Sequence, residues 1–280
     1  MSYPEELLAV ISAPDAAAKD ALLVRISPPA SDITWNLEEV PFRPGRTARY
    51  REVANPARRR RGLNHKHTRL RFLHSIHHIE LTAIDLAVLL CLRAPGAPTE
   101  LHRDFLAIAR EEAEHSQLLG ELLTREGFPP GSDPVHHRLW DSARAATNLG
   151  EQLVVVPRFL EARGLDVSAE LLPRLVHIDA ASHAVISRIY NDEIRHVATG
   201  SRWHAWWCAQ HDTTIEAHFA ATVEQHFATQ VPGPFALDRD GRRQAGFSAA
   251  ELELLEHPPW EIFPIGAKPS DEQGTVPPRS

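Results

Sequence analysis

The chain has 280 residues, of which 43% are hydrophobic and 24% are charged, with a net charge of -7 and two cysteines. This composition indicates one or two globular domains with a sizeable apolar core, and it excludes a disulfide framework or a cysteine-rich zinc site. No apolar run reaches the ~18 residues of a membrane span and the N-terminus lacks a signal-peptide pattern, so we expect a cytoplasmic protein outside the membrane. Cys91 and Cys208 stand among apolar neighbours and are expected to be buried free thiols.

Residues 1–64 are predicted to form an N-terminal extension that wraps around the rest of the protein, since they combine Pro and Arg with short helical stretches. One of these helices is expected from 16 to 24. Asp15 is a suitable N-cap for it.

A basic segment runs from Arg43 to Arg71 and contains eleven Lys or Arg residues and one acidic residue, Glu52. One interpretation is a solvated segment whose arginines neutralise the acidic surface of the helices. The other is a binding patch for a phosphate-bearing substrate or partner, with Arg58 to Arg61 at its centre. The sequence leaves both interpretations open.

Residues 65–230 are predicted to form a helical body, because no segment alternates polar and apolar residues as a strand does. The first helix should run from 66 to 92 and end at a turn rich in Pro and Gly. The second should begin with Thr99 as its cap. Antiparallel packing around this turn brings Glu80 and Glu112 to the same level, since similar numbers of residues separate each of them from the turn.

The third helix of the body is less regular than the first two. Pro157 is expected to kink or interrupt it just before Glu161, because a proline removes one backbone hydrogen bond. Gly164 and Asp166 follow as turn residues, and a short separate helix is expected from 168 to 177.

The fourth helix is predicted to start at Ala180, with Asp179 as its cap, and to end in a segment with three tryptophans. Residues 231–280 are then expected to form a C-terminal extension. It holds one short helix from 248 to 256 and a polar tail.

Two Glu-x-x-His pairs lie on the second and fourth predicted helices, Glu112 with His115 and Glu193 with His196. Residues three apart share one face of a helix, so both members of a pair point into the same space. Each pair follows a lone glutamate, Glu80 or Glu161, by the same 32 residues. A single pair of this kind also arises by chance on an amphipathic helix, whereas the matched spacing indicates a common site.

Four carboxylates and two imidazoles that point into one four-helix bundle can hold two metal ions. Hard oxygen donors mixed with histidine favour iron or manganese, so we expect two Fe ions, two Mn ions or a mixed Fe/Mn pair. Glu151 competes with Glu161 for the place on the third helix. Its spacing of 42 residues to Glu193 does not match the 32 residues of the first half.

Three further side chains are candidates for roles beside the metals, and each also fits an ordinary core position. Tyr190 lies one turn before Glu193 and is expected to be a catalytic phenol, a hydrogen-bond donor to a ligand, or a core tyrosine. His77 shares a face with Glu80 and is a candidate auxiliary ligand or proton carrier. His183 is a candidate for supporting a ligand.

Four phrases carry a resemblance to known proteins: His-His-Ile-Glu-Leu, Arg-Glu-Glu-Ala-Glu-His, Leu-Glu-Ala-Arg-Gly-Leu-Asp and Asn-Asp-Glu-Ile-Arg-His. Together they resemble the ferritin-like superfamily, and more narrowly an uncharacterised bacterial family of ferritin-like proteins known as a domain of unknown function, from the N-terminus to Glu256. Glu-Ala-Arg at 161 to 163 is similar to a ligand-bearing phrase in the tRNA hydroxylase branch. The resemblance implies an all-α fold, a ferritin-like antiparallel four-helix bundle with N-terminal and C-terminal extensions. The metal ligands that it implies are Glu80, Glu112, His115, Glu161, Glu193 and His196.

The function that this resemblance implies is an oxygen-activating oxidoreductase, similar to a hydroxylase, acting on an unidentified small molecule or modified nucleotide. An electron donor protein and a homo-oligomer are possible partners. One alternative is a ferroxidase or another iron-handling protein. A second alternative is a structural bundle whose metal site is vestigial, and the sequence leaves these alternatives open.

Overall fold

The computed structural model describes residues 1–30, 33–36, 40–54, 62–228 and 235–259. Within these ranges all named secondary structure is helical, and the prediction of an all-α protein is confirmed for them. An isolated bridge joins Glu52 to Val135. Arg58 to Arg61, the centre of the candidate basic patch, and the tail after 259 lie outside the described residues.

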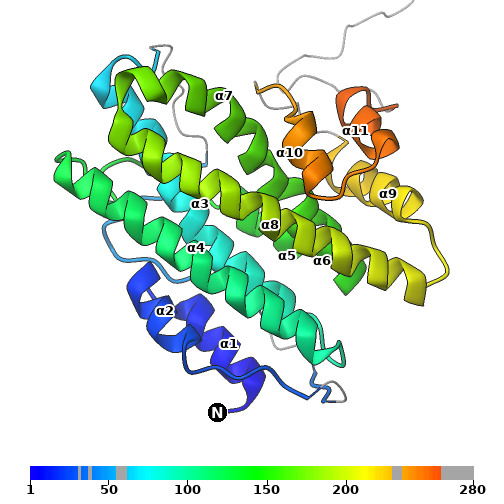
Figure 1. Cartoon of the computed structure of the whole chain (residues 1–280). Coiled ribbons are helices and arrows are strands. Elements are labelled where there is room, and N and C mark those ends of the chain that lie inside the picture. The colour runs from blue at the N-terminus through cyan, green and yellow to red at the C-terminus, as the bar shows by residue number, and fades with distance from the viewer. Residues whose placement is uncertain (31–32, 37–39, 55–61, 229–234, 260–280) are drawn as a thin grey trace, which may run out of the picture.

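Four long helical segments lie side by side in the centre of the molecule (Figure 1). They are α3 (Lys66–Leu92), α4 (Thr99–Arg125), a composite segment of α6 (Leu149–Leu153), η1 (Val154–Glu161) and α7 (Ala162–Ile178), and α8 (Ala180–Gln210). Helix α3 packs on α4, α7 packs on α8, and α8 also packs on α4. The predicted start and end of the first helix are thus confirmed, and Pro98 rather than Thr99 is the N-cap of α4.

Side-chain contacts show that α4 runs antiparallel to α8. Asp104 near the start of α4 accepts a hydrogen bond from Trp203 near the end of α8, at 2.8 Å. Further along α4, His115 lies 3.0 Å from Asp192, which is earlier in α8. Contacts that advance along one helix while they recede along the other define opposite chain directions.

Helix α3 is buried on nearly every side. Among the described residues it is the one helix long and apolar enough to be a candidate membrane span, and 89% of the apolar window is buried inside the protein. An apolar helix enclosed in this way has the character of a core helix. Its polar residues Glu80 and Asp85 are therefore held in the interior, where each needs a partner of opposite charge.

The third segment contains a stretch of π-helix, η1, with Pro157 inside it. The irregularity predicted before Glu161 is therefore a widening of the helix, and the chain continues directly into α7. Gly200 on α8 faces this point, since a Cβ there would lie 2.3 Å from Pro157 Cβ. The glycine lets α8 pack closely against the widened turn that carries Glu161.

The separate short helix predicted from 168 to 177 is wrong, because these residues belong to the continuous helix α7. Asp166, which we expected in a turn, instead binds Arg242 with both carboxylate oxygens, at 2.9 and 2.7 Å. It also accepts the backbone N–H of Asp238. These long-range partners stabilise Asp166 within the helix, whereas its local preference is for a turn.

Two short N-terminal helices, α1 (Tyr3–Ser12) and α2 (Ala16–Leu23), lie on one flank of the bundle against α3 and α4 (Figure 1). Asp15 caps α2 as predicted. Lys19 is fully buried and its ammonium lies 2.7 Å from Asp85 on α3. Arg46 binds the other oxygen of Asp85 at 2.8 Å. This buried charge cluster fastens the N-terminal part to the central helix.

The opposite flank is covered by the C-terminal helices (Figure 1), which are α9 (Ile215–Phe227), α10 (Arg239–Gln244) and α11 (Ala249–Glu256). The helix predicted from 248 to 256 is thus confirmed, with Ser248 as its N-cap. Helix α5 (Arg138–Ala145) lies against α3 and η1. Buried Arg158 on η1 holds α11 through Glu251 at 2.8 Å.

Candidate metal centre

Three of the four long segments deliver buried ligand-type side chains to one point between them. One oxygen or nitrogen from each of four residues lies within 4.8 Å of the others: Glu80 on α3, Glu112 and His115 on α4, and Glu193 on α8. All four side chains are buried. His196 joins them, with its Nδ1 2.8 Å from Glu112 Oε1 and 3.9 Å from Glu193 Oε1.

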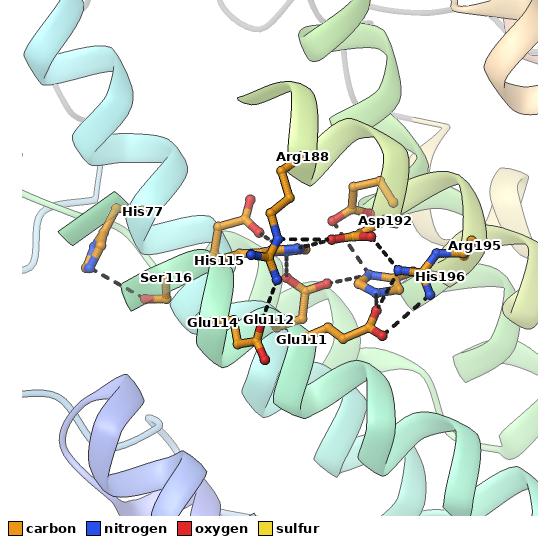
Figure 2. Close-up of polar contacts among 12 residues, drawn as sticks. His77, Glu111, Glu112, Glu114, His115, Ser116, Arg188, Asp192, Arg195 and His196 are labelled. Atoms are coloured by element: carbon orange, nitrogen blue, oxygen red, sulfur yellow. Dashed lines mark hydrogen bonds and ion pairs between the residues drawn. The ribbon is translucent and has the colours of Figure 1, made fainter. Parts of the chain in front are cut away.

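Glu112 lies at the middle of this cluster (Figure 2). Its Oε2 lies 3.3 Å from Nδ1 of His115, and the same Nδ1 lies 3.3 Å from Oε2 of Glu80. The other oxygen of Glu112 faces His196. One carboxylate is thus shared by two histidines whose ring centres are 5.8 Å apart.

Glu161 ends the π-helical stretch and is the ligand candidate from the third segment. Burial and the charges of Glu112 and Glu80 raise the pKa of its carboxyl well above the ordinary value, which places it in the electrostatic field of the cluster. Its competitor Glu151 is elsewhere, since it accepts the Thr147 N–H at 2.7 Å and pairs with His226 at 3.2 Å. Glu161 is not among the four residues whose ligand atoms lie within 4.8 Å of one another, so its place as a ligand stays a prediction.

The closely spaced carboxylates and histidines of the cluster shift one another's pKa values. Burial and the charge of Glu112 raise the pKa of Glu80 to about 7, and burial and the same charge raise the pKa of Glu193 well above its usual range. Burial acts to lower the pKa of His115, but hydrogen bonds and charges of Glu112 and Glu80 prevail and raise it to about 12. The pKa values of these three groups are thus raised, as expected where buried carboxylates lie close together.

Several inward-facing atoms of the cluster are buried without a hydrogen bond of regular geometry: Glu80 Oε2, Glu112 Oε1, Glu193 Oε2 and His196 Nδ1. Three of them face another charged group of the cluster, since Glu112 Oε1 lies 2.8 Å from His196 Nδ1 and Glu80 Oε2 lies 3.3 Å from His115 Nδ1. Buried polar atoms in proteins are nearly always satisfied, so carboxylates that converge without regular hydrogen bonds can accept a further partner. All of these atoms carry a lone pair when deprotonated. The donor set therefore fits a metal cation.

Outside the cluster, each histidine binds a carboxylate from the opposite helix through its second ring nitrogen (Figure 2). Nε2 of His115 on α4 lies 3.0 Å from Asp192 on α8. Nε2 of His196 on α8 lies 2.7 Å from Glu111 on α4. A carboxylate at Nε2 keeps the proton on that nitrogen and leaves Nδ1 free for a metal, an arrangement typical of metal-binding histidines.

The outer carboxylates belong to the candidate site, and our sequence reasoning did not select them. The structure joins Glu111 to His196 and Asp192 to His115. A signal was present, because an acidic residue stands directly before each Glu-x-x-His pair, as Glu111 before Glu112 and Asp192 before Glu193.

The other side chains singled out from the sequence lie away from the cluster. The hydroxyl of Tyr190 donates to Asp238 at 2.6 Å, so its catalytic role stays a prediction without support from this contact. His77 contacts Tyr50 and Ser116, at 3.3 and 3.5 Å, and burial lowers its pKa to about 3. His183 is half-buried on α8.

A second group of metal-type side chains, on α8 and α9, is satisfied without an ion. His204 accepts a hydrogen bond from Arg158 at Nδ1, at 2.7 Å, and its Nε2 lies 2.8 Å from His218. Cys208 is a buried free thiol beside His204. Cys91 in α3 is also a buried free thiol, so the expectation is confirmed for both cysteines. The first cluster is the better candidate, because it brings three carboxylates and two histidines together and several of its inward atoms lack hydrogen bonds of regular geometry.

Comparisons with known proteins give a family match and a relative. A family model described as "Protein of unknown function (DUF455)" matches residues 9–253. An "Uncharacterized protein" from Haemophilus influenzae is 33% identical over 192 residues, which span 65% of this chain and 66% of that protein. No solved structure matches. Because the family model covers most of the chain, the protein belongs to the DUF455 family.

Proposed function

We propose that the protein is a di-metal carboxylate protein with a ferritin-like bundle and that it is an oxygen-activating oxidoreductase. The observation that carries the proposal is the convergence of buried carboxylates and two histidines, each histidine held from behind by a further carboxylate.

The side chains divide into two sets around Glu112. Glu80 and His115 lie on one side of it and would hold one ion. Glu193 and His196 lie on the other side and would hold a second ion, together with Glu161. Glu112 lies between the two sets and would contribute to holding both ions. The proposed ligands are thus all six residues selected from the sequence.

Carboxylates with imidazoles and no thiolate suit iron or manganese. Two such ions would supply the reduction of dioxygen and the oxidation of an organic substrate. The chain contributes a dry site that helices enclose. The substrate class that we propose is a small molecule or modified nucleotide, with electrons from a donor protein.

The metal content of purified protein tests this proposal. Elemental mass spectrometry on native protein should find about two iron or manganese ions per chain, as expected for carboxylate bundles with these ligands. Glu112→Gln should lose most of the metal, because it removes the charge shared by both sets. Glu121→Gln is the matched control, since Glu121 is exposed on the same helix α4.

Reaction of the Fe²⁺-loaded protein with dioxygen separates an oxidoreductase from the iron-handling alternative. An oxidoreductase consumes oxygen in proportion to an electron donor and stays a small assembly. Iron uptake far above two ions per chain, with mineral formation, would favour iron handling. Native protein that binds no metal after reconstitution would refute the proposal and favour the vestigial-site alternative.

A further inference from the structure

The two outer carboxylates, Asp192 and Glu111, lead from the buried histidines to the surface of α4 and α8. The histidine side chains are 0% and 2% exposed, whereas Asp192 is 17% exposed and Glu111 is 35% exposed. One carboxylate residue therefore separates each of the two histidines from solvent. Any group that fixes both outer carboxylates at the surface acts on both histidines.

Arg195 is such a group, because its guanidinium contacts both carboxylates at once (Figure 2). Nη2 binds Asp192 Oδ1 and lies 3.3 Å from Glu111 Oε2, while Nη1 lies 3.4 Å from Glu111 Oε1. The Arg195 side chain is itself 60% exposed. It joins the two histidine–carboxylate pairs at their outer ends.

We propose that Arg195 is a positioning residue that links the two halves of the metal centre. Through Asp192 it sets the orientation of His115, and through Glu111 it sets the orientation of His196. A planar guanidinium with several donors can bind two carboxylates in fixed directions, whereas a lysine ammonium holds one point. The inference rests on the proposed function, because it assigns a role toward the same ions.

The proposed effect of Arg195 is distinct from that of an ordinary surface ion pair. Exposed pairs contribute little to folding, so loss of Arg195 should leave the metal-free fold nearly as stable as before. Outer-shell partners of metal ligands nevertheless change metal affinity by about 10- to 100-fold when they are removed. The signature of the role is therefore a change in metal binding without a change in folding.

The chain offers a close control for this residue. Arg202 lies two turns further along α8, is 61% exposed, and pairs with Asp104 on α4. It thus bridges the same two helices in the same way, with no candidate ligand behind its partner. Arg195→Gln and Arg202→Gln remove the same charge from the same face.

Titration of the metal-free protein with Co²⁺, followed by its visible absorption, tests the proposal. Arg195→Gln should weaken Co²⁺ binding about 10-fold and shift the absorption bands, with Arg195→Lys in between. Arg202→Gln should match native protein in affinity and spectrum. Thermal unfolding of the metal-free forms should be the same for both Gln variants.

A double-mutant comparison shows whether Arg195 acts through the outer carboxylates. In a background of Asp192→Asn with Glu111→Gln, the further change Arg195→Gln should have little added effect on Co²⁺ affinity. Fully additive losses of Co²⁺ affinity would overturn the role of Arg195, and so would an Arg195→Gln variant that binds Co²⁺ as tightly as Arg202→Gln does. In either case, Co²⁺ binding by native protein would still uphold the metal centre. Absence of Co²⁺ and Fe²⁺ binding in native protein would overturn both.

Discussion

The buried carboxyl of Glu80 gives the metal-free protein a pH dependence that can be isolated with one substitution. Burial and the charge of Glu112 raise its pKa from 4.5 to about 7. Between these pH values the folded protein keeps a proton on Glu80 that the unfolded chain has lost. Stability from this group is therefore fully present below pH 4.5 and is lost as the pH rises through about 7.

The size of the effect follows from the shift itself. Each pKa unit corresponds to about 1.4 kcal/mol, so the rise in the pKa of Glu80 costs the folded state about 3 kcal/mol at pH 8. Other buried groups change stability in the opposite sense, among them His77 and His204, whose pKa values burial lowers to about 3 and about 2. The measurable quantity is thus the difference between native protein and Glu80→Gln.

Urea unfolding of EDTA-treated protein at several pH values from 4.5 to 8 provides this difference. The free energy of unfolding of Glu80→Gln, relative to native protein, should rise by about 3 kcal/mol over this range. Metal-loaded samples should show the reverse order at pH 8, because ions bind deprotonated ligands and stabilise only native protein fully. A difference that stays constant between pH 4.5 and pH 8 would refute the electrostatic reasoning.

Two further predictions concern the parts of the fold that hold the centre in place. Asp85→Ala leaves the buried charges of Lys19 and Arg46 without their carboxylate partner. The free energy of unfolding, measured in urea, should therefore fall by about 3–5 kcal/mol, and an effect below about 1 kcal/mol would contradict the anchoring role. Gly200→Ala puts a methyl group 2.3 Å from Pro157 Cβ and should cost about 1–3 kcal/mol. It should also reduce metal content, because the displaced η1 carries Glu161, and unchanged metal content would show that the site tolerates this shift.

Sequence patterns predicted the first, second and fourth long helices and the place of Glu112 and His115 on one helix face, because both depend on short-range helical geometry. The first helix and the caps Asp15 and Asp179 were predictable from local chemistry alone. Glu112 with His115 follows from the i, i+3 relation within one helix. These features need no knowledge of how helices are placed in space.

The third segment could not be predicted to the same degree, since its shape depends on distant residues. Pro157 signalled an irregularity but not a π-helical stretch, which is accommodated by Gly200 on another helix. Gly164 looked like a turn residue, whereas it lies inside helix α7, where a Cβ would make only an ordinary contact with the Glu193 carboxylate carbon at 3.9 Å. Asp166 is held in the helix by Arg242.

The crossed histidine–carboxylate pairs follow from a repeated pattern once the helix direction is known. Both long helices carry an acidic residue followed directly by Glu-x-x-His, so acid and histidine are four residues apart, as are Glu111 and His115. Four residues make about one helical turn, which keeps the acid and the histidine on neighbouring faces. When two such helices pack antiparallel at the level of the pattern, the first position of each meets the last position of the other. The contacts of His115 with Asp192 and of His196 with Glu111 show this exchange.

This five-residue pattern is therefore more specific than Glu-x-x-His alone. Glu-x-x-His requires one helix face, whereas two copies with a leading acid require a pair of antiparallel helices in one register. The same register places Arg195 between both leading acids, since it directly precedes His196 and lies three residues after Asp192 on the same helix. An exposed arginine directly before the second histidine is therefore a sequence feature that indicates this arrangement. The comparison of Arg195→Gln with Arg202→Gln tests its role directly.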